Sequence, residues 1–459
     1  MNDTSLLRVK NIHVDGLFGL FNHSVEMKLD ERVTILHGPN GVGKTMLLQM
    51  VNAFLKGQYS LFQKVPFKRF ALEFTDDSKV ELTTDQNEPT TKHAKKRLIF
   101  YLFRQGKLVE EHDVSLDVLS MAEDIESWVP WLRRVEDDLW LDEESTEFLS
   151  AEKMISSYQD EIPSRMRSER SMTEPQDPRW LTEWRNQVMV YFIETQRFLR
   201  FTPESVHRFR PYLRTVFTVL DCARDLNRRI NDTMAQYGQQ SQTLDQSFPQ
   251  RLLSKGVTPL SAGALKEKME ELDTNRSKLK EIGLLNEQQE YPFDTNALDR
   301  LDETQQSVMT LYVDDTVKKL AELEDLARRT RLLLDNVNRK FHHKQIRIDR
   351  DDRDDRDDRE HGLVAEGEKS KLLPLNKLSS GEQHELVLHY DLLFRVSPNT
   401  LVLIDEPELS LHVTWQKRFL PDLLEIVAMA KCDVLIATHS PFIVGDRSDL
   451  MVGLDVEPL

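Results

Sequence analysis

Short blocks of apolar residues, separated by polar turns, run through the first quarter of the chain. The blocks "LLRVKNIHV" and "RVTILH" lie within residues 6–36, and "FKRFALEF", "SKVELTTD" and "KRLIFYLFRQGKLVEEHDV" follow after residue 66. Their alternation of apolar and polar positions, rich in β-branched and aromatic residues, predicts antiparallel strands with one buried face. Residues 46–56 instead predict a helix that ends near Lys56.

The middle of the chain changes to helical spacing. Residues 115–185 are acidic and contain Trp128, Trp131 and Trp140, which predicts a helical insertion whose tryptophans serve mainly in packing. "QVMVYFIETQRF" (187–198) returns to strand character, and a long helical region begins at Pro203.

Two apolar seams mark that long region. The first contains Leu265, Met269, Leu272 and Leu279, and the second contains Leu320, Leu323, Thr330, Leu334, Val337 and Phe341. Because Gly283 and Pro292 fall between the seams, we expect a short antiparallel helical hairpin with its tip near residues 283–300. Core packing in a helical bundle would produce the same spacing.

The last part of the chain contains two apolar runs that end in polar residues. "NTLVLIDEPELSLH" (399–412) and "CDVLIATHSP" (432–441) are typical of buried parallel strands that present side chains at their carboxyl ends. Asp405, Glu406 and His439 are those side chains. The low-complexity run "DRDDRDDRDDRE" (349–360) is expected to be a solvated loop between the strands "KQIRI" and "GLVAE".

Charge is segregated along this acidic chain of net charge −17. Residues 194–231 hold eight Arg against four acids, residues 318–347 hold nine Lys or Arg against four acids, and residues 117–147 hold eleven acids against two Arg. The total argues against a protein that coats nucleic acid, while the basic stretches 197–229 and 328–347 are candidate sites for an acidic partner or DNA. Solvated helix faces, the usual explanation of charge runs, are the alternative for these stretches.

Composition also bears on location. No apolar run approaches the roughly 18 residues of a membrane span. The first residues, "MNDTSLLRVK", lack the pattern of a signal peptide. The two cysteines, Cys222 and Cys432, have no spacing that indicates a metal site or a disulfide framework. We therefore expect a cytoplasmic protein.

The stretch "GPNGVGKT" (38–45) carries the strongest chemical signal, because it follows an apolar strand and opens the helix at residue 46. Glycines at this spacing let backbone N–H groups turn toward phosphates, and the helix N-terminus adds positive potential. Lys44 is placed to reach the β- and γ-phosphates, and Thr45 to hold Mg²⁺. The sequence therefore predicts a site for ATP and Mg²⁺, in which Asp405 coordinates the metal, Glu406 orients or deprotonates water and His439 contacts the γ-phosphate.

Taken together, these motifs resemble an ABC-type ATPase head. Residues 38–45 match its Walker A motif, 378–382 ("LSSGE") its signature, 401–406 its Walker B, 410–412 its D-loop and His439 its switch histidine. The resemblance implies nucleotide binding by Asn40, Gly41, Gly43, Lys44, Thr45 and Gln196, the last of which would also sense Mg²⁺. It further implies that Ser379 and Gly381 contact the nucleotide of an opposite subunit, with Glu406, His439 and Lys44 as catalytic residues.

The resemblance favours the SMC/RecF/OLD-like (AAA_15/AAA_21) branch, because Ser380 stands where transporter ATPases have Gly and because a helical arm separates Lys44 from Ser379. Residues 283–300 contain no cysteine for a zinc hook, and only a short stretch follows His439, too short for the TOPRIM domain of OLD nucleases. The layout is similar to the separate ATPase subunits of two-gene phage-defence systems, most closely PARIS and secondly Septu. That similarity implies a homo-oligomer, which in the case of PARIS is a hexamer, together with a separate TOPRIM-like nuclease and an acidic DNA-mimicking trigger. A RecF/SMC-like repair ATPase that clamps DNA is the alternative.

The expected fold is thus α/β: a P-loop head with an antiparallel β lobe, a helical insertion and a helical hairpin. We expect the head to comprise residues 1–114, 187–202 and 345–459, the acidic insertion residues 115–186, and the arm residues 203–344.

Overall fold

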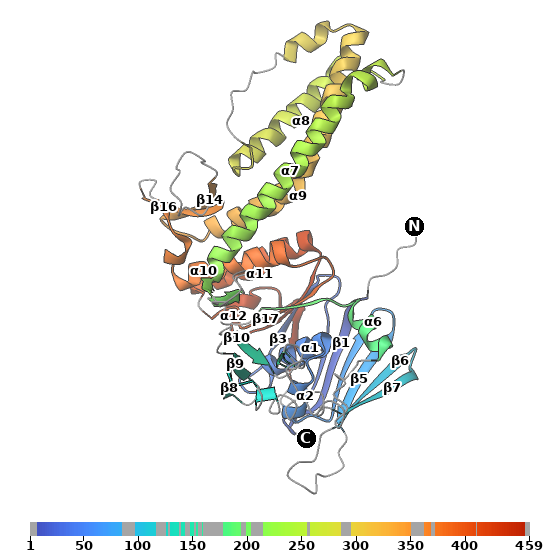
Figure 1. Ribbon diagram of the computed structural model, residues 1–459, viewed down its shortest axis with the longest axis vertical. Coiled ribbons are helices and arrows are strands. Elements are labelled where there is room, and N and C mark those ends of the chain that lie inside the picture. The colour runs from blue at the N-terminus through green and yellow to red at the C-terminus, as the bar shows by residue number, and fades with distance from the viewer. Residues whose placement is uncertain are drawn as a thin grey trace. The chain divides into compact units, whose positions relative to one another are not determined.

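The computed structural model describes residues 7–84, 97–115, 125–126, 129–136, 139–142, 147–150, 153–154, 158, 178–193, 199–202, 214–254, 258–285, 295–349, 362–368, 372–409 and 411–454. The chain divides into two compact units. We call Met1–Val216 with Arg395–Leu459 the head unit and Phe217–Phe394 the arm unit, and describe each by itself. Figure 1 labels their helices and strands.

A five-stranded parallel sheet forms the centre of the head unit, in the order β11-β17-β18-β3-β19. Its strands are β3 (Val33–His37), β11 (Val190–Ile193), β17 (Leu401–Asp405), β18 (Asp433–Ala437) and β19 (Met451–Gly453). Every residue of β17 and β18 is buried. This confirms the prediction that the two apolar runs are buried parallel strands, and it brings their carboxyl ends to one edge.

A six-stranded antiparallel sheet forms the second layer of the head, in the order β2-β1-β4-β5-β6-β7. Its strands are β1 (Val9–Leu17), β2 (Phe21–Glu26), β4 (Arg69–Phe74), β5 (Ser78–Thr84), β6 (Arg97–Arg104) and β7 (Lys107–Ser115). Strand β5 alternates buried and half-buried residues along its whole length. The predicted antiparallel lobe is confirmed, and with it the α/β class.

Helix α1 (Lys44–Lys56) joins the two sheets into one core. It packs on β11, β17 and β18 of the parallel sheet. Its Phe54 ring lies 5.4 Å from that of Phe70 and 6.0 Å from that of Phe100, both in the antiparallel lobe. The helix ends at Gly57, which has a φ of 74°. The predicted end near Lys56 is confirmed, and burial on two sides fixes the helix that follows the glycine-rich loop.

The acidic segment differs from its prediction. Instead of helices alone, the described part forms a three-stranded sheet of β8 (Leu132–Glu136), β9 (Leu139–Asp142) and β10 (Glu147–Ser150), followed by α6 (Arg179–Arg185). Trp140 is fully buried and donates through Nε1 to Glu126 Oε2 at 2.7 Å, in agreement with a packing role. On the same buried face of β9, Asp142 accepts a hydrogen bond from Tyr158. Because an acid occupies one of the buried positions of β9, the sequence lacks the regular alternation of apolar and polar residues that predicts a strand.

The described part of the head unit contains further helices and strands. They are α2 (Ser60–Lys64), β12 (Leu199–Thr202), β13 (Arg214–Phe217), α11 (Val413–Ala430), α12 (Pro441–Val444) and η6 (Ser448–Leu450). Strand β13 ends at Phe217, the first residue of the arm unit.

Three helices form the arm, and their pairing corrects the predicted hairpin. Helices α7 (Thr218–Leu253) and α9 (Glu303–Asn338) run antiparallel, since ion pairs join Arg251 to Asp315 and Lys319 to Asp245 (Figure 1). Helix α8 (Ala262–Glu281), which carries the first seam, instead runs parallel to α9. The ion pairs Lys268–Asp314 and Arg331–Glu281 show this direction.

The prediction of a hairpin tip at residues 283–300 is therefore wrong for the beginning of this range. A Cβ on Gly283 would lie 3.2 Å from the carbonyl oxygen of Ile348, so this glycine sits at the root of the arm rather than at its tip. The 3₁₀ turn η2 (Thr295–Arg300) precedes α9, whose start is fixed by a capping box of Asp302 and Gln305. The two seams predicted buried faces correctly but not which helices face each other.

A small sheet and the signature helix complete the arm unit. The sheet has the order β14-β15-β16, made of Lys344–Asp349, Gly362–Gly367 and Leu372–Leu373. The predicted strands on both sides of the Asp-Arg run are confirmed, and residues 350–361 lie outside the described part. After η4 (Leu375–Lys377), helix α10 (Ser380–Tyr390) packs on α7 and α9 and continues into the π-helix η5 (Asp391–Arg395). Residues 345–394, expected in the head, thus belong to the compact arm unit.

None of the helices in the described ranges combines the length and the apolar composition needed to cross a membrane.

Candidate nucleotide-binding site

The loop between β3 and α1 has the backbone conformation of a phosphate-binding turn. Gly41 and Gly43 have φ angles of 86° and 94°, values that favour glycine. A Cβ on Gly43 would lie 2.6 Å from Cδ2 of Leu17, so only glycine fits there. The carbonyl of Val42 lies 2.7 Å from Nε2 of the buried His23, a support that sequence reasoning missed. The loop is thus held in one shape by its neighbours.

Lys44 lies inside this loop with only 4% of its surface exposed. Its Nζ donates to the carbonyl oxygens of Gly38 at 2.7 Å and Pro39 at 3.0 Å. Burial lowers the pKa of Lys44, while the charges of Glu406, Glu408 and Asp405 act to raise it. An ammonium group held at a ring of glycine-rich backbone is suited to neutralise a polyphosphate.

Thr45 and Asp405 meet at the edge where β17 ends. The Thr45 hydroxyl donates to Asp405 Oδ1 at 3.0 Å. Burial, together with the charges of Glu406 and Glu408, raises the pKa of Asp405, while Thr45 and Lys44 act to lower it. A nearby cation would stabilise the ionised form of this buried carboxylate. The Thr45 hydroxyl and the Asp405 carboxylate are oxygen ligands of the kind that Mg²⁺ prefers.

His439 lies between Lys44 and Glu406. Its Nδ1 is 3.2 Å from Lys44 Nζ, and its Nε2 is 3.7 Å from Glu406 Oε1. Because an ammonium group only donates, Nδ1 is the acceptor, and a neutral His439 carries its proton on Nε2, toward Glu406. Glu406 itself has a φ of 43° and donates its backbone N–H to the Ala437 carbonyl at 2.9 Å, so the backbone turns directly after Asp405. The geometry brings together the acid and the histidine expected from the sequence.

Glu408 organises the loop that carries His439, and the sequence analysis did not single it out. Its Oε1 accepts from the Thr438 hydroxyl at 2.7 Å and from the backbone N–H groups of His439 at 2.7 Å and Ser440 at 3.1 Å. Gln416, on α11, accepts from the Ser440 hydroxyl at 2.7 Å. The signal available in the sequence was only that an acid follows the Walker B strand by three residues.

The signature residues belong to the arm unit. Ser379 is the N-cap of α10, and Gly381 lies in the first turn of that helix. Ser379 and Gly381 therefore belong to a different compact unit from Lys44 and Asp405.

The other predicted positions have different outcomes. Asn40 is exposed on the loop, and His412 caps α11 by accepting from Thr414 N at 3.3 Å. Gln196 and Ser410 lie outside the described residues.

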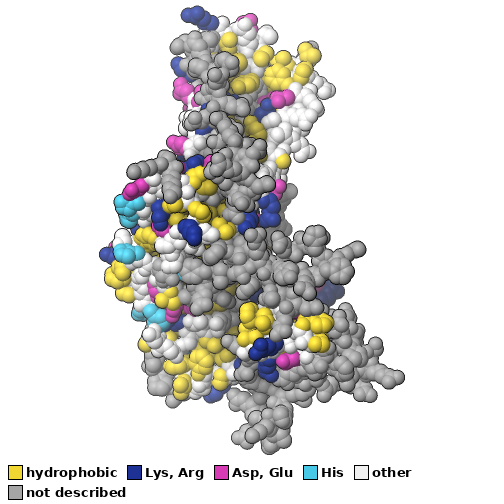
Figure 2. All heavy atoms as spheres, turned by 60° about the vertical axis from the view of Figure 1, so that its left-hand side comes forward, with side chains coloured by type: hydrophobic (Ala, Val, Ile, Leu, Met, Phe, Trp, Pro, Cys, Tyr) yellow, Lys and Arg dark blue, Asp and Glu magenta, His cyan; other side chains and the backbone are white. Residues whose placement is uncertain are grey.

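The described arginines of the basic stretches are largely paired with acids. Asp325 accepts from Arg328 and Arg329, Arg331 pairs with Glu281 at 2.6 Å, and Asp225 holds Arg228 and Arg229. On the arm face shown in Figure 2, side chains of both charge signs lie among apolar ones. The described part of these stretches is therefore a mixed surface rather than a uniformly basic one.

Part of the chain matches a known protein family. Residues 277–445 match AAA_21, described as "AAA domain, putative AbiEii toxin, Type IV TA system". The matched segment contains Ser379, Asp405 and His439 and begins after the glycine-rich loop. This match covers less than half of the chain, and the similarity to an AAA domain agrees with the phosphate-binding geometry at Lys44. No curated protein matches the chain.

Three solved structures of Smc heads are similar over nearly the whole chain. One is an Smc head bound to the C-winged helix domain of ScpA (9% identity, 97% of this chain and 93% of that chain, TM-score 0.33). A second, from Pyrococcus furiosus, is an Smc head with an extended coiled coil bound to the C-terminal domain of ScpA (11% identity, 98% of this chain and 93% of that chain, TM-score 0.31). The third, from Pyrococcus yayanosii, is an Smc head with a coiled coil and joint (12% identity, 97% of this chain and 95% of that chain, TM-score 0.34).

Proposed function

We propose that this protein is an ABC-type ATPase of the SMC/RecF-like branch, which binds and hydrolyses ATP with Mg²⁺ in the cytoplasm. The observation that carries the proposal is the meeting of Lys44, Thr45, Asp405 and His439 at one edge of the parallel sheet. These residues come from three separate parts of the chain, and a structural role for one of them would not require the others.

Each of these residues has a role in the proposed reaction. Lys44 and the loop N–H groups bind the β- and γ-phosphates, and Thr45 and Asp405 hold the metal, with Gln196 as a further ligand. Mg²⁺ supplies charge neutralisation on the phosphate oxygens when bound. Glu406 takes the proton of the attacking water, and His439 contacts the γ-phosphate through the N–H of Nε2.

We further propose that the site is completed by a second copy of the chain. Ser379 and Gly381 would close over the γ-phosphate of the opposite subunit, so that ATP holds two heads together. Exposed apolar side chains of Leu409, Val413 and Phe442 flank the residues of the Walker B end and the His439 loop, which supports a protein contact there. The resulting oligomer is at least a head-to-head dimer, and a hexamer would need a further interface between such dimers.

At the level of physiology, we propose a sensor and scaffold that controls a separate, TOPRIM-like effector nuclease in phage defence. This part of the proposal rests on the resemblance of the motif layout to the separate ATPase subunits of two-gene phage-defence systems; the description of the matched family names a putative toxin and no controlled effector. The basic stretches remain the proposed contact for an acidic trigger. The ion pairs on the described arginines reduce the free charge available there, so trigger binding should depend on shape as well as charge.

Binding of ATP by the purified chain tests the ATPase proposal. Lys44→Ala should weaken Mg·ATP binding at least about 100-fold, because a buried cation at the phosphates is lost, whereas the exposed Lys107→Ala on β7 should bind like the wild type. Wild-type affinity in Lys44→Ala would contradict the proposal.

Phage infection tests the defence role. Cells that carry the gene with its neighbouring genes should lose protection when Lys44 is replaced. Protection that does not need Lys44, or tight ATP-dependent clamping of DNA by the purified protein without any trigger, would favour the repair alternative.

A further inference from the structure

The signature serine is bound by a carboxylate of its own helix. Ser379 donates to Glu382 Oε2 through its backbone N–H at 2.7 Å and through its hydroxyl at 2.9 Å. Glu382 in turn donates its own N–H to the Ser379 hydroxyl, which completes a capping box. The hydroxyl expected to face a phosphate is therefore held next to a negative charge.

That charge has one cationic partner among the described residues. Lys344, at the start of β14, donates through Nζ to both carboxylate oxygens of Glu382, at 2.8 and 3.0 Å. Burial raises the pKa of Glu382, but the hydrogen bonds from Lys344 and Ser379 outweigh it and leave the pKa below its usual value. Glu382 is thus a mostly buried, ionised carboxylate whose charge is balanced by Lys344.

This balance matters if Ser379 receives a phosphate. A bare carboxylate within hydrogen-bonding distance of the serine would repel a γ-phosphate, and in a closed site this repulsion is poorly screened. An ion pair is nearly neutral, so it keeps the cap geometry without that repulsion.

We propose that Lys344 is a positioning residue for the composite ATP site: it neutralises Glu382 so that Ser379 and the start of α10 can accept the γ-phosphate bound by another copy of the chain. The inference rests on the proposed function and adds a residue to it that lies outside every ATPase motif in the sequence.

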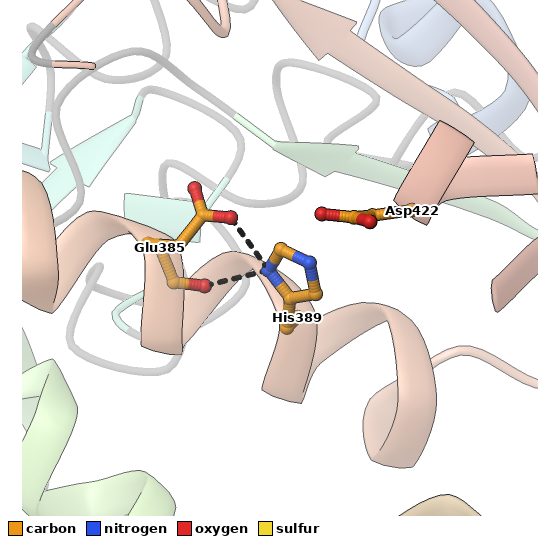
Figure 3. A group of neighbouring side chains, drawn as sticks. All are labelled: Glu385, His389 and Asp422. Carbon is orange, nitrogen blue, oxygen red and sulfur yellow. Dashed lines mark hydrogen bonds and ion pairs between the residues drawn. The ribbon is translucent and has the colours of Figure 1, made fainter. Parts of the chain in front are cut away.

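The position of Lys344 also ties this step to the arm. Helix α10 is fixed to the segment directly after α9 by the buried ion pair of Glu385 with Lys340, and to α7 by the Tyr390 hydroxyl, which donates to Asp225 Oδ2 at 2.7 Å. Figure 3 shows Glu385 beside His389, one turn further along α10. Lys344 follows α9 by a few residues, so a displacement of the arm root would move the counter-ion of the signature carboxylate.

The experiment compares Lys344→Met with a matched control. Mg·ATP binding to Lys344→Met should stay within about twofold of the wild type, because Lys44 and Asp405 are intact, while kcat and ATP-induced association should fall roughly 10- to 100-fold. Lys79→Met removes a similarly buried lysine, one of β5 that pairs with Glu81 at 2.9 Å outside every ATPase motif, and should leave kcat within about twofold.

A second variant separates charge from stability. In Lys344→Met/Glu382→Gln the uncompensated charge is gone, and the amide oxygen introduced by the second substitution can still accept from Ser379. The kcat of this double variant should therefore recover at least about fivefold over that of Lys344→Met alone. Wild-type turnover in Lys344→Met, or a loss that the second substitution does not relieve, would overturn the inference. Absence of ATP hydrolysis by the wild-type protein would instead count against the proposed function.

Discussion

The Thr45 hydroxyl donates to Asp405 Oδ1 at 3.0 Å, although 360 residues separate the two in the chain. Thr45 is the second residue of α1, directly after the glycine-rich loop, and Asp405 ends β17. This hydrogen bond marks the point at which the proposed metal would be bound, and the predictions below start from it.

Replacement of Asp405 should separate stability from metal binding. Burial, with the charges of Glu406 and Glu408, raises the pKa of Asp405, so the native state holds this proton more tightly than the unfolded state. Its ionised form therefore costs stability, and the cost grows as pH rises from the ordinary carboxyl pKa through the raised native value. Asp405→Asn should raise the Tm of the metal-free protein by about 1–3 °C near neutral pH, and the gain should vanish in acid.

The same variant should lose the extra thermal stability that Mg·ATP gives the wild type, which calorimetry with and without ligand measures. The exposed Asp446→Asn is the control. A metal-free Tm below that of the wild type, or full stabilisation by Mg·ATP, would show that Asp405 has another role.

Glu406 should be needed for turnover and not for binding. Glu406→Gln keeps the shape of the side chain beside His439 but removes the proton acceptor. We expect ATP affinity within a few-fold of the wild type, kcat reduced at least about 100-fold, and ATP-bound oligomers that accumulate. Single-turnover kinetics and light scattering measure these effects, with the exposed Glu26→Gln as control. Unchanged turnover would assign Glu406 a structural role.

Glu408 should act through the loop of His439. Glu408→Ala leaves the N–H groups of His439 and Ser440 without the carboxylate that accepts them, so we expect a stability loss of about 1–3 kcal/mol and a roughly 10-fold lower kcat. Glu408→Gln retains an acceptor oxygen and should recover part of both. Denaturant unfolding and ATPase assays provide the measurements, and equal activity in the two variants would contradict this positioning role.

The ion pair of Arg251 with Asp315 should hold the distal part of the arm. The two terminal guanidinium nitrogens of Arg251, Nη1 and Nη2, donate to the Asp315 carboxylate at 2.5 and 2.6 Å, and the Asp315 side chain is 5% exposed. Arg251→Ala leaves this charge uncompensated, so hydrogen exchange at the end of α7 and the start of α9 should quicken roughly 10- to 100-fold. Basal ATPase activity should not change. Arg276→Ala, which breaks an exposed pair with Asp273, should leave exchange nearly unaffected, and equal effects of both variants would contradict the prediction.

The parts that were predictable from the sequence are those with a single strong signal. The helix after Gly43 is specified by the loop glycines before it and by Gly57 after it, and the buried strands ending at Asp405 and Ala437 follow from their unbroken apolar runs. Because parallel strands end at one edge of a sheet, the meeting of Asp405 and His439 with the loop was also foreseeable.

The missed features depend on contacts between distant segments. The strand around Trp140 turns Asp142 inward, so its pattern does not alternate cleanly. The seam of α8 fits α9 in either direction, and only ion pairs such as Lys268–Asp314 show that the two run parallel. The role of Glu408 exists only once the loops after β17 and β18 are close together.

Mixed assemblies of two inactive variants provide the most direct test of the central claim that ATP is hydrolysed in sites shared between copies of the chain. Lys44→Ala removes the phosphate-binding lysine, and Ser379→Arg blocks the signature, so each variant alone should be inactive. A mixed dimer retains one intact site, with Lys44 from one chain and Ser379 from the other, so an equimolar mixture should recover about a quarter of wild-type turnover if pairing is random. The account predicts this recovery. No recovery, in mixtures shown by native mass spectrometry to contain mixed assemblies, would contradict it.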